Sequence, residues 1–288
     1  MDTEFQKAIE ALAPWVGRKR ITEDEIGRSH VRRIAAMLDL DPDAFTPGSA
    51  LPPHWFTMFF PEAVPQSKIG PDGHPAPGVV LPPIPLPRRM GAGRRVDIRG
   101  RLRVGQPATK TAEVVSITPK LGRTGHIAVL TMRHTIETGG AVVAVDEFDA
   151  VYREAVPPGE KTTATPPQPA PTDGEWRSSL ELTPALVFRY SAVTWNAHRI
   201  HYDADYSRTV EGYPTTVQNG GLTMQLMLDA ALANTEAELT GFTARLTRPL
   251  WVGDGVTFSG KRDGDGAMTV WASDAEGALC AQMTLALG

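Results

Sequence analysis

The sequence has only one cysteine, Cys280, in 288 residues. This excludes an internal disulfide framework and any zinc site built from several cysteines, and it is typical of a reducing compartment such as the cytoplasm. An excess of positive charge is also lacking, because 29 Lys and Arg face 33 Asp and Glu, for a formal net charge of −4. A protein that coats nucleic acid is therefore not expected.

Long apolar runs are missing as well. No stretch approaches the roughly 18 uninterrupted apolar residues that a membrane-spanning helix needs, since the most apolar one, Leu81–Pro87, is broken by proline. The first fifteen residues mix charged and apolar side chains and do not resemble a secretion signal, so we expect no targeting peptide. The composition, 41% hydrophobic and 22% charged, is that of a globular protein. We expect a cytoplasmic protein without a membrane segment.

Proline is concentrated in a region that divides the chain. Residues 155–175 combine proline, threonine and small polar side chains, which cannot bury enough apolar surface to order a core. We interpret this region as a linker between an amino-terminal half, residues 1–154, and a carboxy-terminal half, residues 176–288. A second proline-rich stretch, residues 74–87, also carries several aliphatic side chains. We expect it to lie extended on apolar surface of the first half.

The two halves share an order of elements. In each, a helical period is followed by a tight glycine turn, at Gly105 and Gly253, and then by strands with alternating polarity. The strands are expected over residues 108–115, 127–136 and 141–152, and again over residues 255–261, 268–273 and 278–287. A strongly apolar helix is expected over residues 220–239. The repeat predicts an α+β protein with two antiparallel sheets, each wrapped around a central helix, and two unrelated α+β domains are the alternative.

The densest group of polar side chains, residues 191–203, holds two of the seven histidines and an asparagine. Histidine suits proton transfer near neutral pH because its ordinary pKa is close to 6.5, and asparagine can orient a water without exchanging a proton. The turn-rich residues 212–221 follow and lead into the apolar helix, so main-chain N–H groups of Gly220 and Gly221 lie at its positive end. Such an end can bind a developing oxyanion. A helix terminus whose histidines cap carbonyls is the alternative.

At these residues the chain resembles the MaoC-like double hotdog family, which comprises hydratases and dehydratases of acyl thioesters. The matching residues are N-A-H-R-I-H-Y-D at 196–203, followed by Tyr213, Pro214, Gly220 and Leu222. The first half looks like the amino-terminal half of mesaconyl-C4-CoA hydratases and itaconyl-CoA hydratase-like proteins, at residues 53–55, 70–75, 81–90 and 122–125. The resemblance covers nearly the whole chain and implies a double hotdog fold that hydrates an enoyl-CoA thioester, with a small branched dicarboxylyl-CoA as the first substrate expectation.

The resemblance also implies roles for individual residues. The best-known form of the motif has an Asp five residues before the catalytic His, and here Asn196 stands five residues before His201. Asn196 would then hold the water and His201 would transfer the proton, for which a single histidine suffices in a syn addition. His198 is either a second polar contact or structural. The N–H of Gly220 would bind the thioester oxygen, a contact whose removal typically costs about 3 to 4 kcal/mol.

Positive charge in the first half offers a binding site for anionic groups. Seven arginines fall within residues 88–103, with Asp97 alone opposing them, which suits the phosphates of coenzyme A or a free substrate carboxylate. A solvated basic strand edge is the alternative. The residues expected to bind substrate or coenzyme A are Arg88, Arg89, Arg94, Arg95, Tyr213, Asn219 and Gly221. Asn219 departs from related sequences, which often have His before this glycine.

We expect one catalytic site per chain, because the stretch of the first half that matches the motif, residues 37–42, contains no histidine. Asp203 is expected to cap the short segment at Tyr206 rather than to act as a carboxylate partner. A zinc site at His198 and His201 lacks a third ligand at motif spacing, so neither a metal nor a cofactor besides substrate coenzyme A is expected. The remaining histidines are expected to be structural: His30, His54, His74, His126 and His134.

The expected partner is a small-molecule acyl-CoA, without nucleic acid or membrane, and a homodimer through sheet edges is compatible with the fold. Two other functions stay open. A hotdog thioesterase would hydrolyse the thioester, although such enzymes usually activate water with a carboxylate near the helix and Gln218 and Asn219 supply none. A non-catalytic acyl-CoA binding protein is the second alternative.

Overall fold

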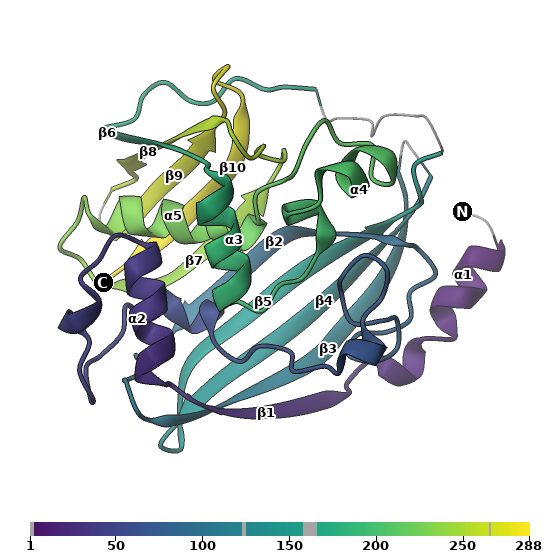
Figure 1. Ribbon diagram of the computed structural model, residues 1–288, viewed down its shortest axis with the longest axis horizontal. Coiled ribbons are helices and arrows are strands. Elements are labelled where there is room, and N and C mark those ends of the chain that lie inside the picture. The colour runs from purple at the N-terminus through teal and green to yellow at the C-terminus, as the bar shows by residue number, and fades with distance from the viewer. Residues whose placement is uncertain (1–2, 123–124, 158–165, 265) are drawn as a thin grey trace.

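The computed structural model describes residues 3–122, 125–157, 166–264 and 266–288. The first half contributes strands β1 (Lys19–Glu25), β2 (Arg88–Ile98), β3 (Pro107–Gly122), β4 (Gly125–Thr138) and β5 (Ala141–Arg153). The second contributes β6 (Trp176–Glu181), β7 (Leu239–Leu246), β8 (Gly255–Arg262), β9 (Ala267–Ser273) and β10 (Leu279–Leu287). They form one antiparallel sheet with the order β1-β3-β4-β5-β2-β7-β10-β9-β8-β6 (Figure 1).

The strand order confirms the internal repeat. Outward from the pairing of β2 with β7, the strand order is β2-β5-β4-β3-β1 in the first half and β7-β10-β9-β8-β6 in the second. Corresponding strands of the two halves therefore follow in the same spatial order. Gly105 and Gly253, which precede the corresponding strands β3 and β8, have φ angles of +82° and +100°, a conformation that glycine adopts at little cost. The two expected sheets are joined into one where β2 pairs with β7, from Gly93 opposite Arg245 to Asp97 opposite Gly241. The arginine-rich strand β2 is therefore interior, not an edge.

The helices lie over the sheet. They are α1 (Thr3–Glu10), α2 (Arg28–Met37), α3 (Pro184–Val193), α4 (Ala204–Thr209) and α5 (Gly220–Leu232), with 3₁₀ turns at Ala13–Trp15, Pro42–Ala44, Pro53–Met58, Gln66–Lys68 and Arg199–His201. Helices α2 and α3 occupy corresponding places in the two halves and pack together (Figure 1). Helix α5 is the central helix of the second half and contacts β7, β8 and β9. In the first half its place in the element order is taken by the six-residue 3₁₀ turn Pro53–Met58.

Helix α5 ends at Leu232, seven residues before the end expected from its apolar pattern. The amide of Asn234 donates to the carbonyl oxygen of Ala230 at 2.8 Å. Asparagine favours such local bonds with the main chain, which compete with continuation of a helix. Leu239, expected within the helix, begins β7 instead.

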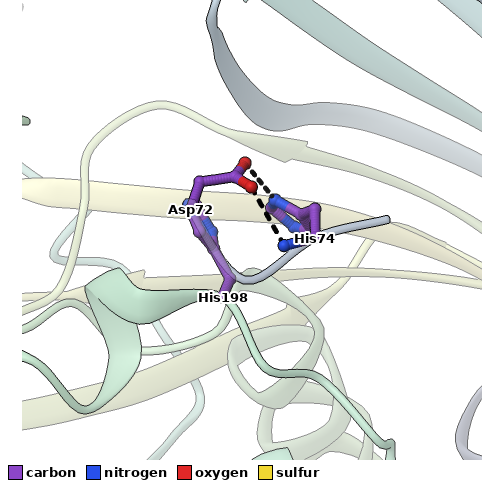
Figure 2. A group of neighbouring side chains, drawn as sticks. All are labelled: Asp72, His74 and His198. Carbon is purple, nitrogen blue, oxygen red and sulfur yellow. Dashed lines mark hydrogen bonds and ion pairs between the residues drawn. The ribbon is translucent and has the colours of Figure 1, made fainter. Parts of the chain in front are cut away.

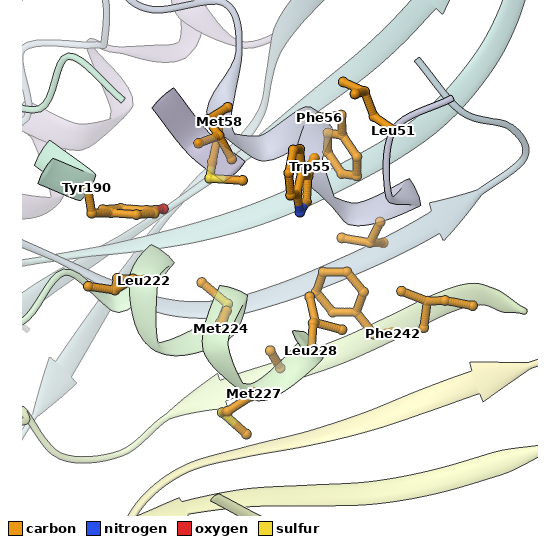
Figure 3. Packing of buried hydrophobic residues seen from close by; sticks show 14 of the residues in the cluster. Leu51, Trp55, Phe56, Met58, Tyr190, Leu222, Met224, Met227, Leu228 and Phe242 are labelled. Carbon is orange, nitrogen blue, oxygen red and sulfur yellow. The ribbon is translucent and has the colours of Figure 1, made fainter. Parts of the chain in front are cut away.

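The largest apolar core spans both halves (Figure 3). Trp55 and Met58 of the first half are buried with Leu222 and Leu228 of α5 and with Phe242 of β7. Burying an apolar side chain of this size contributes about 1.5 to 3 kcal/mol. Because the contributing side chains come from both halves, the two halves are stabilised by a shared core.

A second core lies under the long strands of the first half. Phe5 and Ile9 of α1 pack there with Leu130 of β4, and Ile84 and Leu86 are buried in the same cluster. This confirms the expectation for the end of the proline-rich stretch 74–87, whereas Val79 in the same stretch is exposed. Of the expected linker, residues 158–165 fall outside the described residues, as do residues 123–124 of the segment 122–125.

The end of that linker is attached to the second half. The Leu279 N–H donates to the carbonyl oxygen of Gln168 at 2.7 Å, and Ala170 donates to Gly277 at 2.9 Å. Among the helices of the described ranges, none is long and apolar enough to span a membrane.

Candidate active site

A cavity of about 1740 Å³ lies between the two halves. Its walls include the loop Gly70–Pro75, the start of β2, the segment 194–202 and the beginning of α5. The structure thus brings the histidine-rich segment of the second half together with Arg88 and Arg89 of the first. All the residues predicted to be catalytic line this cavity: Asn196, His198, His201 and Gly220.

His201 lies at the end of the 3₁₀ turn Arg199–His201, and its Nδ1 atom is 2.7 Å from the carbonyl oxygen of Val217. A carbonyl only accepts hydrogen bonds, so Nδ1 carries the proton and Nε2 of the neutral ring is free to accept one. Burial lowers the pKa of His201 to about 4, although the hydrogen bond to Val217 opposes the shift. At neutral pH the imidazole is an uncharged base.

Gly220, the first residue of α5, follows closely after Val217. The first N–H groups of an α-helix have no partner within the helix, and they lie at the positive end of its dipole. A Cβ atom at position 220 would lie 2.5 Å from the Leu246 side chain, and one at 221 would lie 2.3 Å from the Tyr190 hydroxyl. The two glycines therefore let the helix start approach its neighbours closely, and they leave N–H donors at the cavity wall.

Two residues of the first half, Asp72 and His74, lie next to His198 (Figure 2), and His74 lines the cavity. The ring of His198 is buried, with its centroid 4.0 Å from that of His74 and 5.4 Å from that of His201. His74 Nδ1 is 2.9 Å from the Asp72 carboxylate, which also accepts from the His74 main-chain N–H at 3.0 Å. Burial lowers the pKa of both His198 and His74, so both rings are neutral at neutral pH.

Asp72 and His74 were missed by sequence reasoning, which assigned His74 a structural role. The sequence feature that could have identified them is the segment Gly70–Pro75, which belongs to the family resemblance. The structure shows its position: a Cβ atom on Gly73 would lie 1.8 Å from the carbonyl oxygen of Ala197, so the two loops touch through their main chains. The Arg199 N–H donates to the Asp72 carbonyl oxygen at 2.8 Å. The first half therefore contributes to the wall of the predicted catalytic site.

Ligand atoms of Asp72, His74 and His198 all lie within 4.8 Å of one another, close enough to hold a metal ion. The Asp72 carboxylate, however, already accepts two hydrogen bonds from His74. The positive charge of Arg89 also acts on this group. After burial, which is the largest influence on each of the three pKa values, this charge lowers the pKa of His74, His198 and Asp72. A nearby cation opposes the binding of another, so the metal-free site stays our prediction.

Asn196 lines the cavity, and its Oδ1 atom accepts the His198 N–H at 3.0 Å. This bond assigns the amide orientation and leaves Nδ2 as a donor. Asn219 is almost fully buried, and its Nδ2 atom donates to Ser191 Oγ at 3.2 Å. Its side chain thus attaches the start of α5 to α3. The expected cap is confirmed, because Asp203 Oδ1 accepts the Tyr206 N–H at 2.9 Å.

Of the four arginines of β2 that were predicted to bind substrate, two line the cavity and two do not. Arg94 and Arg95 are outside the cavity lining. The expectation that Asp97 alone opposes these charges is wrong, because β5 pairs with β2 and supplies acidic residues. Arg94 contacts Asp146 at 2.6 Å, and Arg95 contacts Asp149 at 2.7 Å.

Arg88 and Arg89 both line the cavity, together with Tyr213 and Gly221. Arg88 is buried, and its Nε atom is 2.8 Å from the Glu211 carboxylate. It also donates to the Tyr213 hydroxyl at 3.4 Å. This ion pair links β2 to the segment between α4 and α5, so Arg88 and Tyr213 form a wall of the cavity.

Known proteins share both the sequence and the architecture. The model of the family described as hydroxyacyl-thioester dehydratase type 2 matches residues 54–252. The mesaconyl-C(4)-CoA hydratase of Chloroflexus aurantiacus is 40% identical over 238 residues, 82% of this chain and 84% of that protein.

Among solved structures, a MaoC-like dehydratase from Phytophthora capsici has a TM-score of 0.72 at 13% identity and covers 97% of both chains. A Mycobacterium tuberculosis protein described as having a double hotdog fold has a TM-score of 0.59 at 15% identity, covering 95% of this chain and 96% of its own. These two likenesses establish the double hotdog fold. With the family match over most of its length and the 40% identical relative, the chain belongs to the hydroxyacyl-thioester dehydratase type 2 family of hydro-lyases.

Proposed function

We propose that this protein adds water reversibly across the α,β-double bond of an enoyl-CoA thioester. The observation that carries the proposal is the bond from His201 Nδ1 to the Val217 carbonyl oxygen. It leaves Nε2 as a base and attaches that base to the segment that leads into α5, where Gly220 presents its N–H. A base and an oxyanion donor held in one unit are what hydration of a thioester-activated alkene requires.

In the proposed reaction, His201 Nε2 takes a proton from a water molecule while the water oxygen bonds to Cβ. The alkene electrons move toward the thioester, and its oxygen gains negative charge beside the Gly220 N–H. His201 then returns its proton to Cα, so that one water is added and the imidazole is neutral again. A pKa of about 4 makes the protonated ring a strong acid, which favours this second transfer.

Asn196 and His198 border the same space. Asn196 Nδ2 remains a donor after its Oδ1 has bonded the main chain, and we assign it to the water. Neutral His198 packs between the rings of His74 and His201, and we assign it to their positioning. Coenzyme A enters as part of the substrate, and the proposal requires no further cofactor.

For the acyl group we propose a small branched dicarboxylyl-CoA. The 40% identical relative is named for mesaconyl-C(4)-CoA, and cavity residue Arg89 supplies a charge complementary to a second carboxylate. The pantetheine arm of the substrate would be bordered by Tyr213 and by Arg88, whose charge is paired with Glu211. We also expect a cytoplasmic enzyme and a homodimer.

The test is to mix purified protein with crotonyl-, mesaconyl-C4-, itaconyl- and longer enoyl-CoA esters while following enoyl-thioester absorbance and free thiol in parallel. Loss of absorbance without thiol release is the expected result, with the fastest turnover for a branched dicarboxylyl ester. Thiol release would replace the proposal by a thioesterase. No change in either signal would favour an acyl-CoA binding protein.

A further inference from the structure

Arg89 differs from its neighbours on β2, because it has no carboxylate partner among the residues that the structure describes. Arg88, Arg94 and Arg95 each form an ion pair. Among the ion pairs of the described ranges, none involves Arg89, although it is only half-exposed and lines the cavity. A guanidinium cannot lose its proton in a protein, and removing a charge from water without a partner is costly. An unneutralised cation in a cavity therefore indicates an anionic ligand.

Arg89 lies beside a buried phenol. It lies opposite Tyr152 in the register of β2 and β5, and Tyr152 is buried in the core of the first half. Burial raises the pKa of Tyr152, whereas the nearby positive charge of Arg89 opposes the shift. A neutral phenol beside the guanidinium leaves its charge uncancelled.

Arg89 lies at the catalytic end of the cavity. Gly91, two residues further along β2, lies against the Leu246 side chain, which also lies against Gly220 at the start of α5. In agreement with this position, the charge of Arg89 acts on Asp72, His74 and His198, the group that packs against His201. When the thioester oxygen lies at Gly220, the phosphates of coenzyme A are a full pantetheine arm away from this place. The anion nearest to Arg89 must then belong to the acyl group. Among the ion pairs of the described residues, Asp72 is not paired with Arg89, and its carboxylate oxygens accept from His74.

We infer that Arg89, which lies opposite Tyr152 at the start of β2, binds the free carboxylate of a dicarboxylyl-CoA substrate and so determines acyl specificity. The inference rests on the proposed function, because it assumes that the reacting carbon lies beside His201. A planar guanidinium can bind a carboxylate through two parallel hydrogen bonds. In a branched ester with its carboxylate on Cβ, this contact would also orient Cβ toward the base.

Binding of two saturated esters tests the inference without turnover. 3-Methylsuccinyl-CoA, with its thioester at C1, carries a methyl group and the carboxylate on Cβ, and isovaleryl-CoA carries a second methyl group in place of that carboxylate. Calorimetric titration should give tighter binding of methylsuccinyl-CoA to the wild-type protein. Arg89→Gln should weaken that binding about 10- to 100-fold and leave isovaleryl-CoA binding unchanged, whereas Arg89→Lys should weaken it less. Arg133→Gln is the matched control, because Arg133 pairs with Glu147 outside the cavity lining.

Equal weakening of both esters by Arg89→Gln would overturn the inference, because Arg89 would then bind the coenzyme A part. Unchanged binding of both would also overturn it. Isovaleryl-CoA binding by the variant shows that it is folded. Hydration of the whole panel of enoyl-CoA esters, with and without a second carboxylate, by the wild-type protein is measured separately, so a failure of the proposed activity and a failure of carboxylate recognition give different results.

Discussion

The imidazole of His201 donates its Nδ1 proton to the carbonyl oxygen of Val217, 2.7 Å away, and the Val217 N–H donates in turn to the carbonyl oxygen of Ile200 at 2.9 Å. The segment that carries the base is thereby attached twice to the segment that leads into α5. Because Gly220 begins that helix, the base and the N–H donors keep a fixed relative position. Catalytic groups need such fixed geometry to act on opposite ends of one substrate.

His201→Ala should lower kcat for hydration of an enoyl-CoA ester by about 10²- to 10⁴-fold, the usual contribution of a general base, while the Kd for a saturated acyl-CoA changes little. Steady-state kinetics and calorimetric titration measure the two quantities. His126→Gln is a suitable control, because His126 pairs with Glu154 outside the cavity lining. Turnover by His201→Ala equal to that of the wild type would remove His201 from the mechanism.

The pH profile should report the lowered pKa of His201. Burial brings this pKa to about 4, and the base acts in its neutral form, so kcat/KM should be constant from pH 8 to pH 6 and should fall toward pH 4. A histidine with an ordinary pKa near 6.5 would lose activity about two pH units higher. Initial rates between pH 4 and 8 test this, with circular dichroism to show where the protein stays folded. A midpoint near pH 6.5 would contradict the assignment.

Much of the fold could be predicted because it depends on local patterns. Alternating strands after Gly105 and Gly253 revealed the repeat, and the sheet order confirms it. Strand β2 was considered only as a solvated basic edge and its bounds were not predicted, since prolines precede it and Gly91 and Gly93 interrupt its pattern of side chains. Only tertiary pairing places β2 between β5 and β7, and only that register reveals which acidic residues neutralise its arginines.

The candidate site was predicted for the half that carries the motif. His201 and Gly220 are close in sequence, and the chemistry that each can perform follows from residue type and from the start of a helix. Asp72 and His74 reach the site through contact between loops of different halves, where Gly73 meets Ala197. Neither residue type nor spacing predicts such a contact, because it depends on how the two halves are joined.

Removal of divalent metal should not change activity. Asp72, His74 and His198 form a group that could hold an ion, but the carboxylate is hydrogen-bonded within the group and a cationic side chain acts on it. Dialysis against a chelator is therefore expected to leave kcat/KM unchanged, and elemental analysis of the purified protein should find no stoichiometric metal. Loss of activity that is restored by zinc would show that this group is a metal centre.

Asp146→Asn should destabilise the protein strongly. Asp146 is 1% exposed, and Arg94 holds the pKa of its carboxyl far below the usual range despite the opposing effect of burial. Breaking a buried ion pair by removing one partner typically costs about 3 to 5 kcal/mol. Glu147→Gln on the same strand, whose carboxylate pairs with half-exposed arginines, should cost about 0 to 1 kcal/mol. Urea unfolding compares the two variants, and equal midpoints would contradict this difference.

Gly73→Ala should impair catalysis because it separates the two halves of the site. Gly73 and Gly78 both have positive φ angles, +89° and +83°, a conformation that costs an alanine about 1 to 2 kcal/mol. At Gly73 the added Cβ would also lie 1.8 Å from the Ala197 carbonyl oxygen, whereas at Gly78 the nearest atom is 3.8 Å away. Gly78→Ala thus carries the backbone strain without the collision. We expect Gly78→Ala to retain its kcat and Gly73→Ala to lose most of it, since moving the Asp72–His74 loop displaces the His198 ring. Equal kcat values for the two variants would show that contact between these loops does not position the catalytic histidines.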